Sequence, residues 1–170
     1  LAYNTANGVA IASGADYTDI FIISTDYVTL EGLQVAATRY GSIGFRQTDS
    51  TYTHTSVSQC IFENGASDGD PVKEIRCGTF SNLLVICRRA PSVAVIHTSY
   101  PSSLYFVNCT IVLTSNITPS GYAFTSFGSP VNVINCAGYG FATFVDTDGN
   151  FSGNNNSSDV AIGFGTSNQA

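Results

Sequence analysis

The sequence contains no methionine and no tryptophan, and it is poor in charge: six basic residues stand against twelve acidic ones, for a net charge of −6. Nucleic-acid binding depends on clustered cations that neutralise phosphates, so this composition argues against a nucleic-acid partner. The apolar runs are too short for a helix of about 20 residues that could span a bilayer, so no membrane partner is expected. No basic segment followed by an apolar one opens the chain, and we therefore expect no secretory signal.

The chain starts at Leu1 without an initiator methionine, so we expect it to be a segment of a longer gene product. Its 170 residues fit a single domain, 1–170, and 44% hydrophobic residues are enough for a real core. Disorder is not expected, because it requires low hydrophobicity together with high charge.

Small polar and β-forming residues dominate what is present. Serine, threonine and asparagine are abundant, and they stand beside many glycines and many Val, Ile, Phe and Tyr residues. This mixture is typical of short strands separated by turns. No window shows the apolar spacing of an amphipathic helix. The composition predicts an all-β fold.

A pattern of six consecutive residues recurs along the chain. It consists of an apolar residue, any residue, a turn-forming residue, a small apolar residue, any residue and a second apolar residue. Its period is roughly 26 residues, which lies within the range of solenoid repeats. The spacing is nearly regular, since the fourth position falls at Leu33, Cys60, Leu83, Cys109 and Cys136. A second apolar segment follows each copy. The copies are 30–35, 57–62, 80–85, 106–111 and 133–138, and the second segments are 43–46, 72–76, 93–96, 122–125 and 141–145.

Such a repeat is typical of a parallel β-solenoid, because one unit cannot bury its apolar face alone while stacked units can. We expect about six rungs, with Asn82, Asn108 and Asn135 adjacent at one left-handed bend. A β-sandwich would not explain why the same columns return at this period. One inward column should contain the five fourth-position residues, Leu33, Cys60, Leu83, Cys109 and Cys136.

The five cysteines are an odd number, so a complete disulfide framework is excluded. Cys60, Cys109 and Cys136 are expected to be small buried residues. Cys109 and Cys136 would lie on adjacent rungs and could just meet the Cα distance of a disulfide, but stacked parallel side chains rarely reach its torsion. No C-x-x-C motif is present, so zinc is unsupported. All five thiols are expected to be free.

The repeated V-x-N-C phrase and the V-x-L-E-G-L-x-V phrase resemble right-handed parallel β-helix proteins of the pectate-lyase-like superfamily. More narrowly, residues 26–33 resemble a rung of β-helix proteins encoded by tailed bacteriophages, and residues 154–159 resemble the loop before their closing coil. The resemblance covers about residues 20–160 and is specific for the fold, not for an activity. It implies a virion protein, in an extracellular particle, whose final coil is missing here.

Enzymes of the pectate-lyase-like superfamily hold calcium or transfer protons with clustered aspartates beside a cation. The matching cluster here is the acidic segment 63–76, in which Asp68 and Asp70 would bind a metal and Arg76 would abstract a proton. Gly65 and Pro71 equally mark the segment as a surface loop with solvated charge. The sequence favours this second interpretation.

Other candidate sites are weaker. Asp146 and Asp148 belong to half of a calcium loop that lacks the closing bidentate glutamate, and a type I turn explains them equally well. The Arg88–Arg89 pair is interpreted as a solvated edge or protomer contact, and neither His54 nor His97 lies in a nucleophile motif. We therefore assign no catalytic, cofactor-binding or metal-ligating residue and expect no cofactor.

Residues 90–145 contain no Asp, Glu, Lys or Arg. Much of this uncharged belt must be surface in a solenoid, and interface centres are poor in charge and rich in aromatic residues. We expect it to face other virion proteins or copies of the same chain, as a homotrimer. A glycan-binding strip and a merely neutral surface are the alternatives. The aromatic residues expected on its outside are Tyr100, Tyr105, Tyr122, Phe124, Phe127 and Tyr139.

Together these features predict a structural or receptor-facing β-helix of a bacteriophage virion, placed in a tail, spike, fibre or capsid decoration. A polysaccharide lyase or hydrolase of the tailspike kind and a bacterial surface adhesin are the alternatives. The acidic segment supports the enzyme, whereas the uncharged belt supports the structural role.

Overall fold

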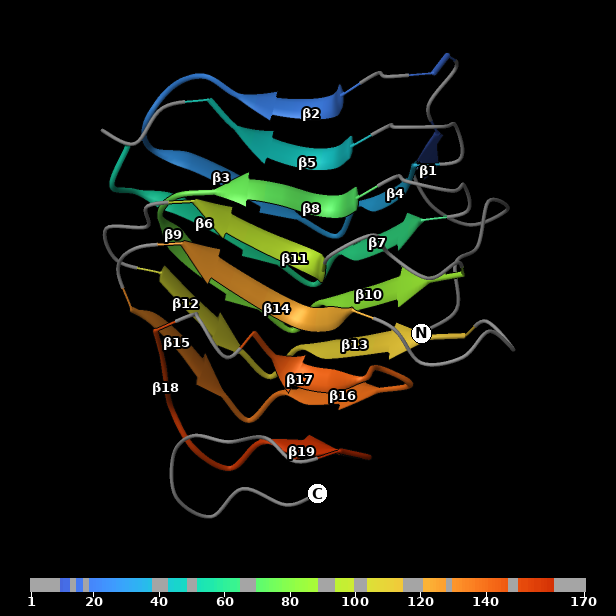
Figure 1. The fold of residues 1–170 in the computed structure, drawn as a ribbon. Helices are drawn as coiled ribbons and strands as arrows, with labels where there is room; N and C mark the ends of the chain where they lie inside the picture. Colours follow the sequence, from blue (N-terminus) through green and yellow to red (C-terminus); the bar gives the residue numbers. More distant parts are fainter. Residues whose placement is uncertain are drawn as a thin grey trace.

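The fold is an all-β parallel solenoid (Figure 1). The structure is a computed structural model, and it describes residues 10–12, 15–16, 19–37, 43–48, 52–64, 70–88, 94–99, 104–114, 121–127, 130–146 and 150–160. No helix occurs among these residues. The prediction of an all-β solenoid is therefore confirmed.

Three parallel sheets, called A, B and C here, form the walls of the solenoid. Sheet A contains β1 (Ala10–Ala12), β4 (Gln34–Ala37), β7 (Ile61–Asn64), β10 (Leu84–Cys87), β13 (Thr110–Leu113), β16 (Ala137–Tyr139) and β19 (Ser157–Ser158). Sheet B contains β2 (Asp19–Ile23), β5 (Ile43–Gln47), β8 (Asp70–Ile75), β11 (Ala94–Ser99), β14 (Tyr122–Phe127) and β17 (Thr143–Val145). Sheet C contains β3 (Val28–Glu31), β6 (Thr55–Ser58), β9 (Gly78–Ser81), β12 (Leu104–Val107), β15 (Val131–Ile134) and β18 (Phe151–Ser152).

The chain visits sheets B, C and A in turn, and each strand pairs with the strand one circuit later. The first position of the sequence repeat lies in register through sheet C, and all of its pairings are parallel: Leu30 with Val57, Phe80, Phe106 and Val133 in succession. The spacing between successive copies of the repeat is thus the length of one circuit. Parallel pairing throughout excludes the β-sandwich.

The number of complete turns is smaller than the sequence predicts. In three turns, β5–β7, β8–β10 and β11–β13, every strand has four to six residues and pairs on both sides. Outside them, β16 and β17 have three residues, β18 and β19 have two, and β2 and β3 pair on one side only. The expectation of about six equivalent rungs is therefore corrected to about three complete turns. End strands lose one neighbour and with it half of their ladder of hydrogen bonds.

The bend between sheets C and A repeats the same backbone conformation in successive circuits. The residues with positive φ in this column are Gly32 (72°), Gln59 (53°), Asn82 (53°), Asn108 (54°), Asn135 (52°) and Asn155 (57°). Their amides form a ladder, in which Asn82 N donates to Val107 O and Asn108 N to Ile134 O, both at 3.0 Å. Asn108 Nδ2 also donates to Asn82 Oδ1 at 3.4 Å. The predicted asparagine bend is confirmed, since asparagine tolerates the left-handed region better than most side chains.

The inward column after this bend is also confirmed. Cys60, Leu83, Cys109 and Cys136 are each at most 2% exposed, and Leu33 is partly buried against them. Cys109 N lies 3.4 Å from Cys136 Sγ, so these two residues stack directly. All five cysteines are buried and free, as predicted. Desolvation raises the pKa of the Cys60 and Cys77 thiols, which suits their role as small buried groups.

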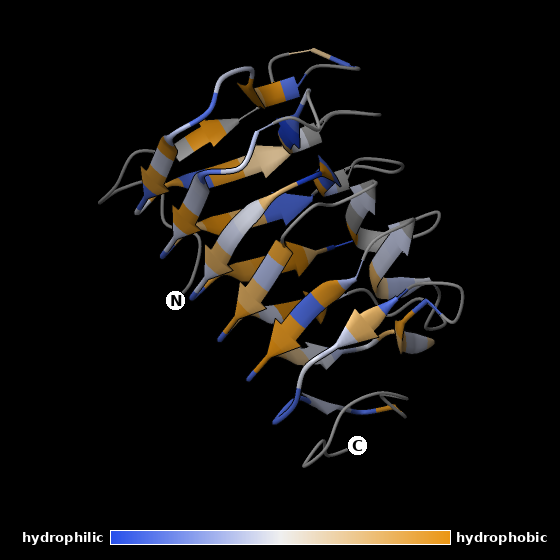
Figure 2. Ribbon diagram, turned by 90° about the vertical axis from the view of Figure 1, so that its left-hand side faces the viewer, coloured by the Kyte–Doolittle hydropathy of each residue, from blue (hydrophilic) through white to orange (hydrophobic). Residues whose placement is uncertain are grey.

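Phenylalanine rings fill the centre of the solenoid. A continuous chain of ring contacts, with centroids 5.1–6.1 Å apart, runs along the axis through Phe62, Phe45, Phe80, Phe106, Phe124 and Phe144. All six are fully buried. The apolar segments recur from strand to strand in Figure 2, as expected when each rung repeats the pattern of the last. The core therefore depends on every rung being in register.

We predict that Leu83→Asp abolishes folding, because an unpaired carboxylate buried in this column costs several kcal/mol. The neighbouring Leu84→Asp is the matched control, since Leu84 is only half-buried. Soluble yield and the urea midpoint followed by circular dichroism measure both variants. A cooperatively folded Leu83→Asp protein with near-normal stability would contradict the inward column.

Candidate functional site

A single carboxylate organises the turns that precede β3 and β6. Asp26 Oδ1 accepts hydrogen bonds from the backbone amides of Tyr27 (3.0 Å), Thr53 (3.1 Å) and His54 (2.7 Å). Asp26 Oδ2 accepts from Thr53 Oγ1 at 3.1 Å and lies 3.4 Å from His54 Nδ1. Because Asp26 stands one circuit before Thr53 in the chain, it ties one turn of the solenoid to the next.

These contacts fix the charge of Asp26. Partial desolvation raises its pKa, but the backbone hydrogen bonds from His54, Tyr27 and Thr53 and the side-chain bond to His54 lower the pKa well below its usual range. The group is therefore ionised at neutral pH. Its lone pairs are already used by donors from its own neighbours, so it acts as a structural anchor.

The two residues that directly precede β3 and β6, Tyr27 and His54, bind Asp26 with their backbone amides and carry aromatic rings. Tyr27 and His54 stack with centroids 4.3 Å apart and planes 7° from parallel. Tyr27 is 78% exposed and has a φ of 60°, an unfavourable conformation for a bulky residue that costs of order 1–3 kcal/mol. The Asp26 bonds hold this strained residue in place. An exposed aromatic ring kept in a strained conformation is typical of a functional site.

The stack ends at His54, because the residue one rung further on turns away from the surface. Cys77 is fully buried and contacts the buried side chain of Gln47. Gln47 Oε1 accepts from Arg76 N (2.7 Å) and Cys77 N (3.0 Å), and its Nε2 donates to Thr55 Oγ1 (2.9 Å). This buried amide therefore fixes the turn before β9 and leaves the surface beside His54 open.

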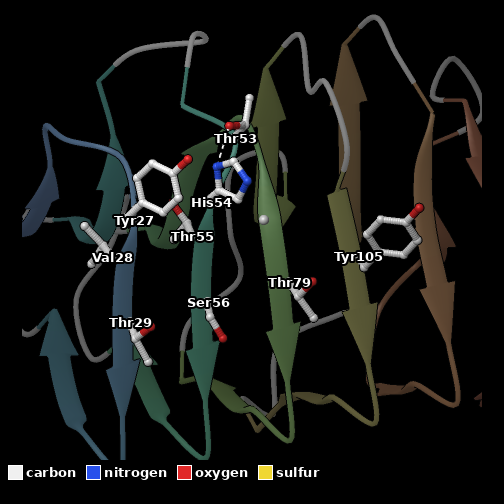
Figure 3. Close-up of a pocket in the computed structure, with 10 residues that line it drawn as sticks. Tyr27, Val28, Thr29, Thr53, His54, Thr55, Ser56, Thr79 and Tyr105 are labelled. Atoms are coloured by element: carbon white, nitrogen blue, oxygen red, sulfur yellow. Dashed lines mark hydrogen bonds between the residues drawn. The ribbon is translucent and has the colours of Figure 1, made fainter.

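The opening is a groove of about 420 Å³ on the outer face of sheet C (Figure 3). His54 stands at one side above β6, and Tyr105, which is 41% exposed, stands at the other side above β12 (Figure 3). The floor is a column of hydroxyl side chains on neighbouring strands. The lining residues are Tyr27, Val28, Thr29, Thr53, His54, Thr55, Ser56, Gly78, Thr79 and Tyr105.

Asp26, His54 and Thr53 have the side chains of a catalytic triad but not its geometry. In a triad the carboxylate binds one imidazole nitrogen and the nucleophile binds the other. Here Thr53 Oγ1 (2.7 Å) and Asp26 Oδ2 (3.4 Å) both approach Nδ1. Thr53 is therefore not activated by His54. The described residues of the groove lining also include no acidic residue, whereas glycoside hydrolysis normally uses a pair of carboxyl groups. The arrangement suits binding.

The two glutamates of the acidic segment 63–76 lie on different sheets. Glu63 lies in sheet A and pairs with Arg88, whereas Glu74 lies in sheet B and pairs with Arg46, with Oε2 and Nε 2.7 Å apart. Residues 65–69, with Asp68, and the Asp70 side chain lie outside the described part of the chain. Among the described residues, no group of three or more His, Cys, Asp or Glu side chains could hold a metal ion.

Of the remaining predicted positions, Asp146 is described by the structure. Asp146 Oδ2 accepts from Thr125 Oγ1 at 2.7 Å in the turn after β17. Asp148, Arg89 and the side chain of His97 lie outside the described part.

His54 stands out in the sequence only as an isolated histidine, yet the repeat contained a signal for the site. The separation that pairs Asp26 with Thr53 and Tyr27 with His54 equals the separation between the first two copies of the repeat. Residues one period apart stack on neighbouring rungs. Applying that rule to the turns as well as to the strands would have placed His54 beside Tyr27.

The uncharged belt is not one continuous surface strip. Tyr105 and Tyr139 are 41% and 43% exposed, as expected, but Tyr105 lies on sheet C and Tyr139 on sheet A. The prediction that Phe124 faces outward is wrong: it is fully buried, because it shares an inward column with Ile96. Tyr122 is half-buried on sheet B, whereas Tyr100 and the Phe127 side chain lie outside the described part.

Comparison with known proteins adds no family: no model of a protein family, no curated protein and no solved structure matches the chain. In the described part of the chain there is no helix long and apolar enough to cross a membrane. The interpretation of the groove therefore depends on its own residues.

We predict that Asp26→Asn lowers stability at neutral pH and removes part of its acid dependence. The folded pKa of Asp26 lies below the ordinary value of 3.8, so its stabilisation is fully present above that value and is lost as the pH falls from there through the folded pKa. Urea midpoints measured across the acidic and neutral range give the difference between variant and wild type, which should shrink in acid. Asp16→Asn, an exposed carboxylate elsewhere, is the control, and a constant difference at all pH values would contradict the prediction.

Proposed function

We propose that this protein is a structural, receptor-facing β-solenoid that binds carbohydrate in the groove of sheet C without cleaving it. The observation that carries the proposal is the combination of exposed aromatic rings, Tyr27, His54 and Tyr105, with the hydroxyl-bearing floor between them. Aromatic rings offer an apolar face to a sugar ring, and hydroxyl groups exchange hydrogen bonds with its edges. The strands beneath, β6, β9 and β12, each pair with a neighbour on both sides, so little order has to be gained on binding.

The setting that we propose for this solenoid is a bacteriophage virion, in a tail, spike, fibre or capsid decoration. Support comes from the resemblance of residues 26–33 to a rung of phage-encoded β-helix proteins and from the parallel solenoid itself. A right-handed winding, as in those proteins, is part of the proposal, since nearly all parallel crossover connections are right-handed. Detection of the chain in purified particles, and identification of the proteins beside it, tests this setting.

Glycan binding predicts a specific mutational result. Tyr105→Ala removes one wall of the groove and should weaken binding of a recognised oligosaccharide by about tenfold, equivalent to ~1.4 kcal/mol. Ile22→Ala is the control, because Ile22 is an exposed apolar side chain on sheet B, away from both the groove and sheet A. Binding to an oligosaccharide array followed by titration calorimetry measures both. Equal loss in the two variants, or release of shortened sugars during incubation, would contradict a non-cleaving groove on sheet C.

We also propose that copies of the chain associate, as a homotrimer, through the outer face of sheet A. The outward column there runs from Glu63 through Ile86 and Val112 to Tyr139, and it is uncharged after Glu63. An apolar, charge-poor surface gains free energy by leaving water.

We predict that Tyr139→Lys weakens this association while leaving the fold intact, because an unpaired ammonium group is costly to desolvate in a contact. Sedimentation equilibrium over a range of concentrations measures the oligomer, and circular dichroism confirms the fold. Tyr105→Lys, on the outer face of sheet C, is the control. Association that survives Tyr139→Lys but not Tyr105→Lys would move the interface to sheet C and contradict the glycan groove.

A further inference from the structure

We infer that the groove of sheet C takes an uncharged glycan, one sugar ring of which lies between His54 and Tyr105 above Thr79, with a hydroxyl group donating to His54 Nε2. The inference rests on the proposed function and deepens it by naming the ligand class and its contacts. Three features of the site lead to it: the shape of the groove, its lack of charge and the tautomer of His54.

The shape favours a flat, narrow ligand. His54 directly precedes β6 and Tyr105 lies in β12, and these two strands are separated by β9 alone. The register aligns Tyr105 with Ser56, two residues beyond His54, so two steps of ~4.8 Å across the sheet and two rises of ~3.3 Å along it place their backbones about 12 Å apart. An α-helix with its side chains is about 10–12 Å wide, as wide as the whole separation of the two backbones, so it does not fit between the two side chains. An added peptide strand needs an open sheet edge, whereas this is the face of paired strands. A single sugar ring over Thr79 is narrow enough for this space and needs no free sheet edge.

The part of the groove that the structure describes is uncharged. Its described lining residues include no Asp, Glu, Lys or Arg. The carboxylate beneath it, Asp26, already receives three backbone amides and the Thr53 hydroxyl and lies beside His54 Nδ1. A carboxylate has about four acceptor sites, so Asp26 is saturated and cannot pair with a cationic ligand.

An anionic ligand would also lack a partner among the described residues of the lining. Arg46 is held by Asp19 and Glu74, and its pKa is raised despite partial desolvation, because both carboxylates stabilise the cation. Arg88 is held by Glu63 on sheet A. Arg76, which precedes β9, does not line the groove. A charged sugar in this groove would therefore lose water without gaining an ion pair, which is unfavourable.

The hydrogen bonds assign the proton of His54. Thr53 Oγ1 donates its only proton to Asp26 Oδ2, so its 2.7 Å contact with His54 Nδ1 requires Nδ1 to carry a hydrogen. In the neutral ring Nε2 is then an acceptor. The second ring nitrogen lies on the side of the ring toward β9, facing the groove (Figure 3). A sugar hydroxyl, which can donate, is the complementary group.

The test uses the full chain with neutral hexasaccharides of glucose, mannose, galactose and rhamnose, and with hexagalacturonate and a heparin hexasaccharide as acidic probes. We expect at least one neutral probe to bind, with an affinity that does not change with added salt. Thr79→Lys and Thr79→Glu should both weaken it, by about tenfold or more, because each fills the floor with an unpaired charge. Ser152→Lys and Ser152→Glu, at exposed positions of the same column beyond Tyr105, are the matched controls.

The variant His54→Phe tests the contribution of the acceptor nitrogen separately from that of the aromatic ring. It keeps an aromatic ring beside Tyr27 but removes Nε2, so binding of the neutral probe should fall while Tyr27→Phe leaves it nearly unchanged. Binding of acidic probes only, strengthened by Thr79→Lys and weakened by Thr79→Glu and by salt, would overturn the uncharged class while leaving the glycan-binding function intact. Failure of every neutral and acidic probe to bind would overturn the proposed function itself.

Discussion

Successive circuits of this solenoid hydrogen-bond to each other between equivalent residues, and the rest of the structure depends on that register. Thr110 N donates to Leu83 O and Ala137 N to Cys109 O, both at 2.8 Å, so the backbone ladder continues through the bends as well as the strands. Like residues are therefore stacked on like. A residue type that fits one position of a circuit also fits the same position of the next circuit. This explains why small residues recur in the inward column and asparagines at the bend before it.

The same constraint that builds the core builds the surface groove. The length of one circuit places Asp26 beside Thr53 and Tyr27 beside His54, so a carboxylate from one turn can organise the backbone of the next. The groove begins where the column of Tyr27 and His54 ends. Cys77, the next residue of that column, is buried because its backbone amide binds the buried amide of Gln47. The regular repeat of the strands forms the floor of the groove. The one turn that departs from the repeat, at Cys77, leaves the space above that floor.

Two buried amides inside the solenoid, those of Gln47 and Asn156, lie where the regular stacking is interrupted. Gln47 is fully buried and bonded on both ends of its amide, so its burial carries little penalty. Asn156 takes the place of the next cysteine in the inward column, and its side chain binds Cys136 N and Val133 O, both at 2.8 Å. Each amide satisfies backbone groups that a further regular rung would otherwise satisfy.

The parallel solenoid, the circuit lengths, the inward column of cysteines and leucines and the left-handed asparagine bend could all be predicted from the chain alone, because each follows from its periodic pattern. Three-dimensional packing was needed to establish how many turns are complete, that Phe124 faces inward, and that Tyr105 and Tyr139 lie on different sheets. It was also needed to find the groove, since Tyr27, His54 and Tyr105 come from three separate circuits. Periodicity fixes which residues stack, but which face of a strand is exposed depends on where the chain bends.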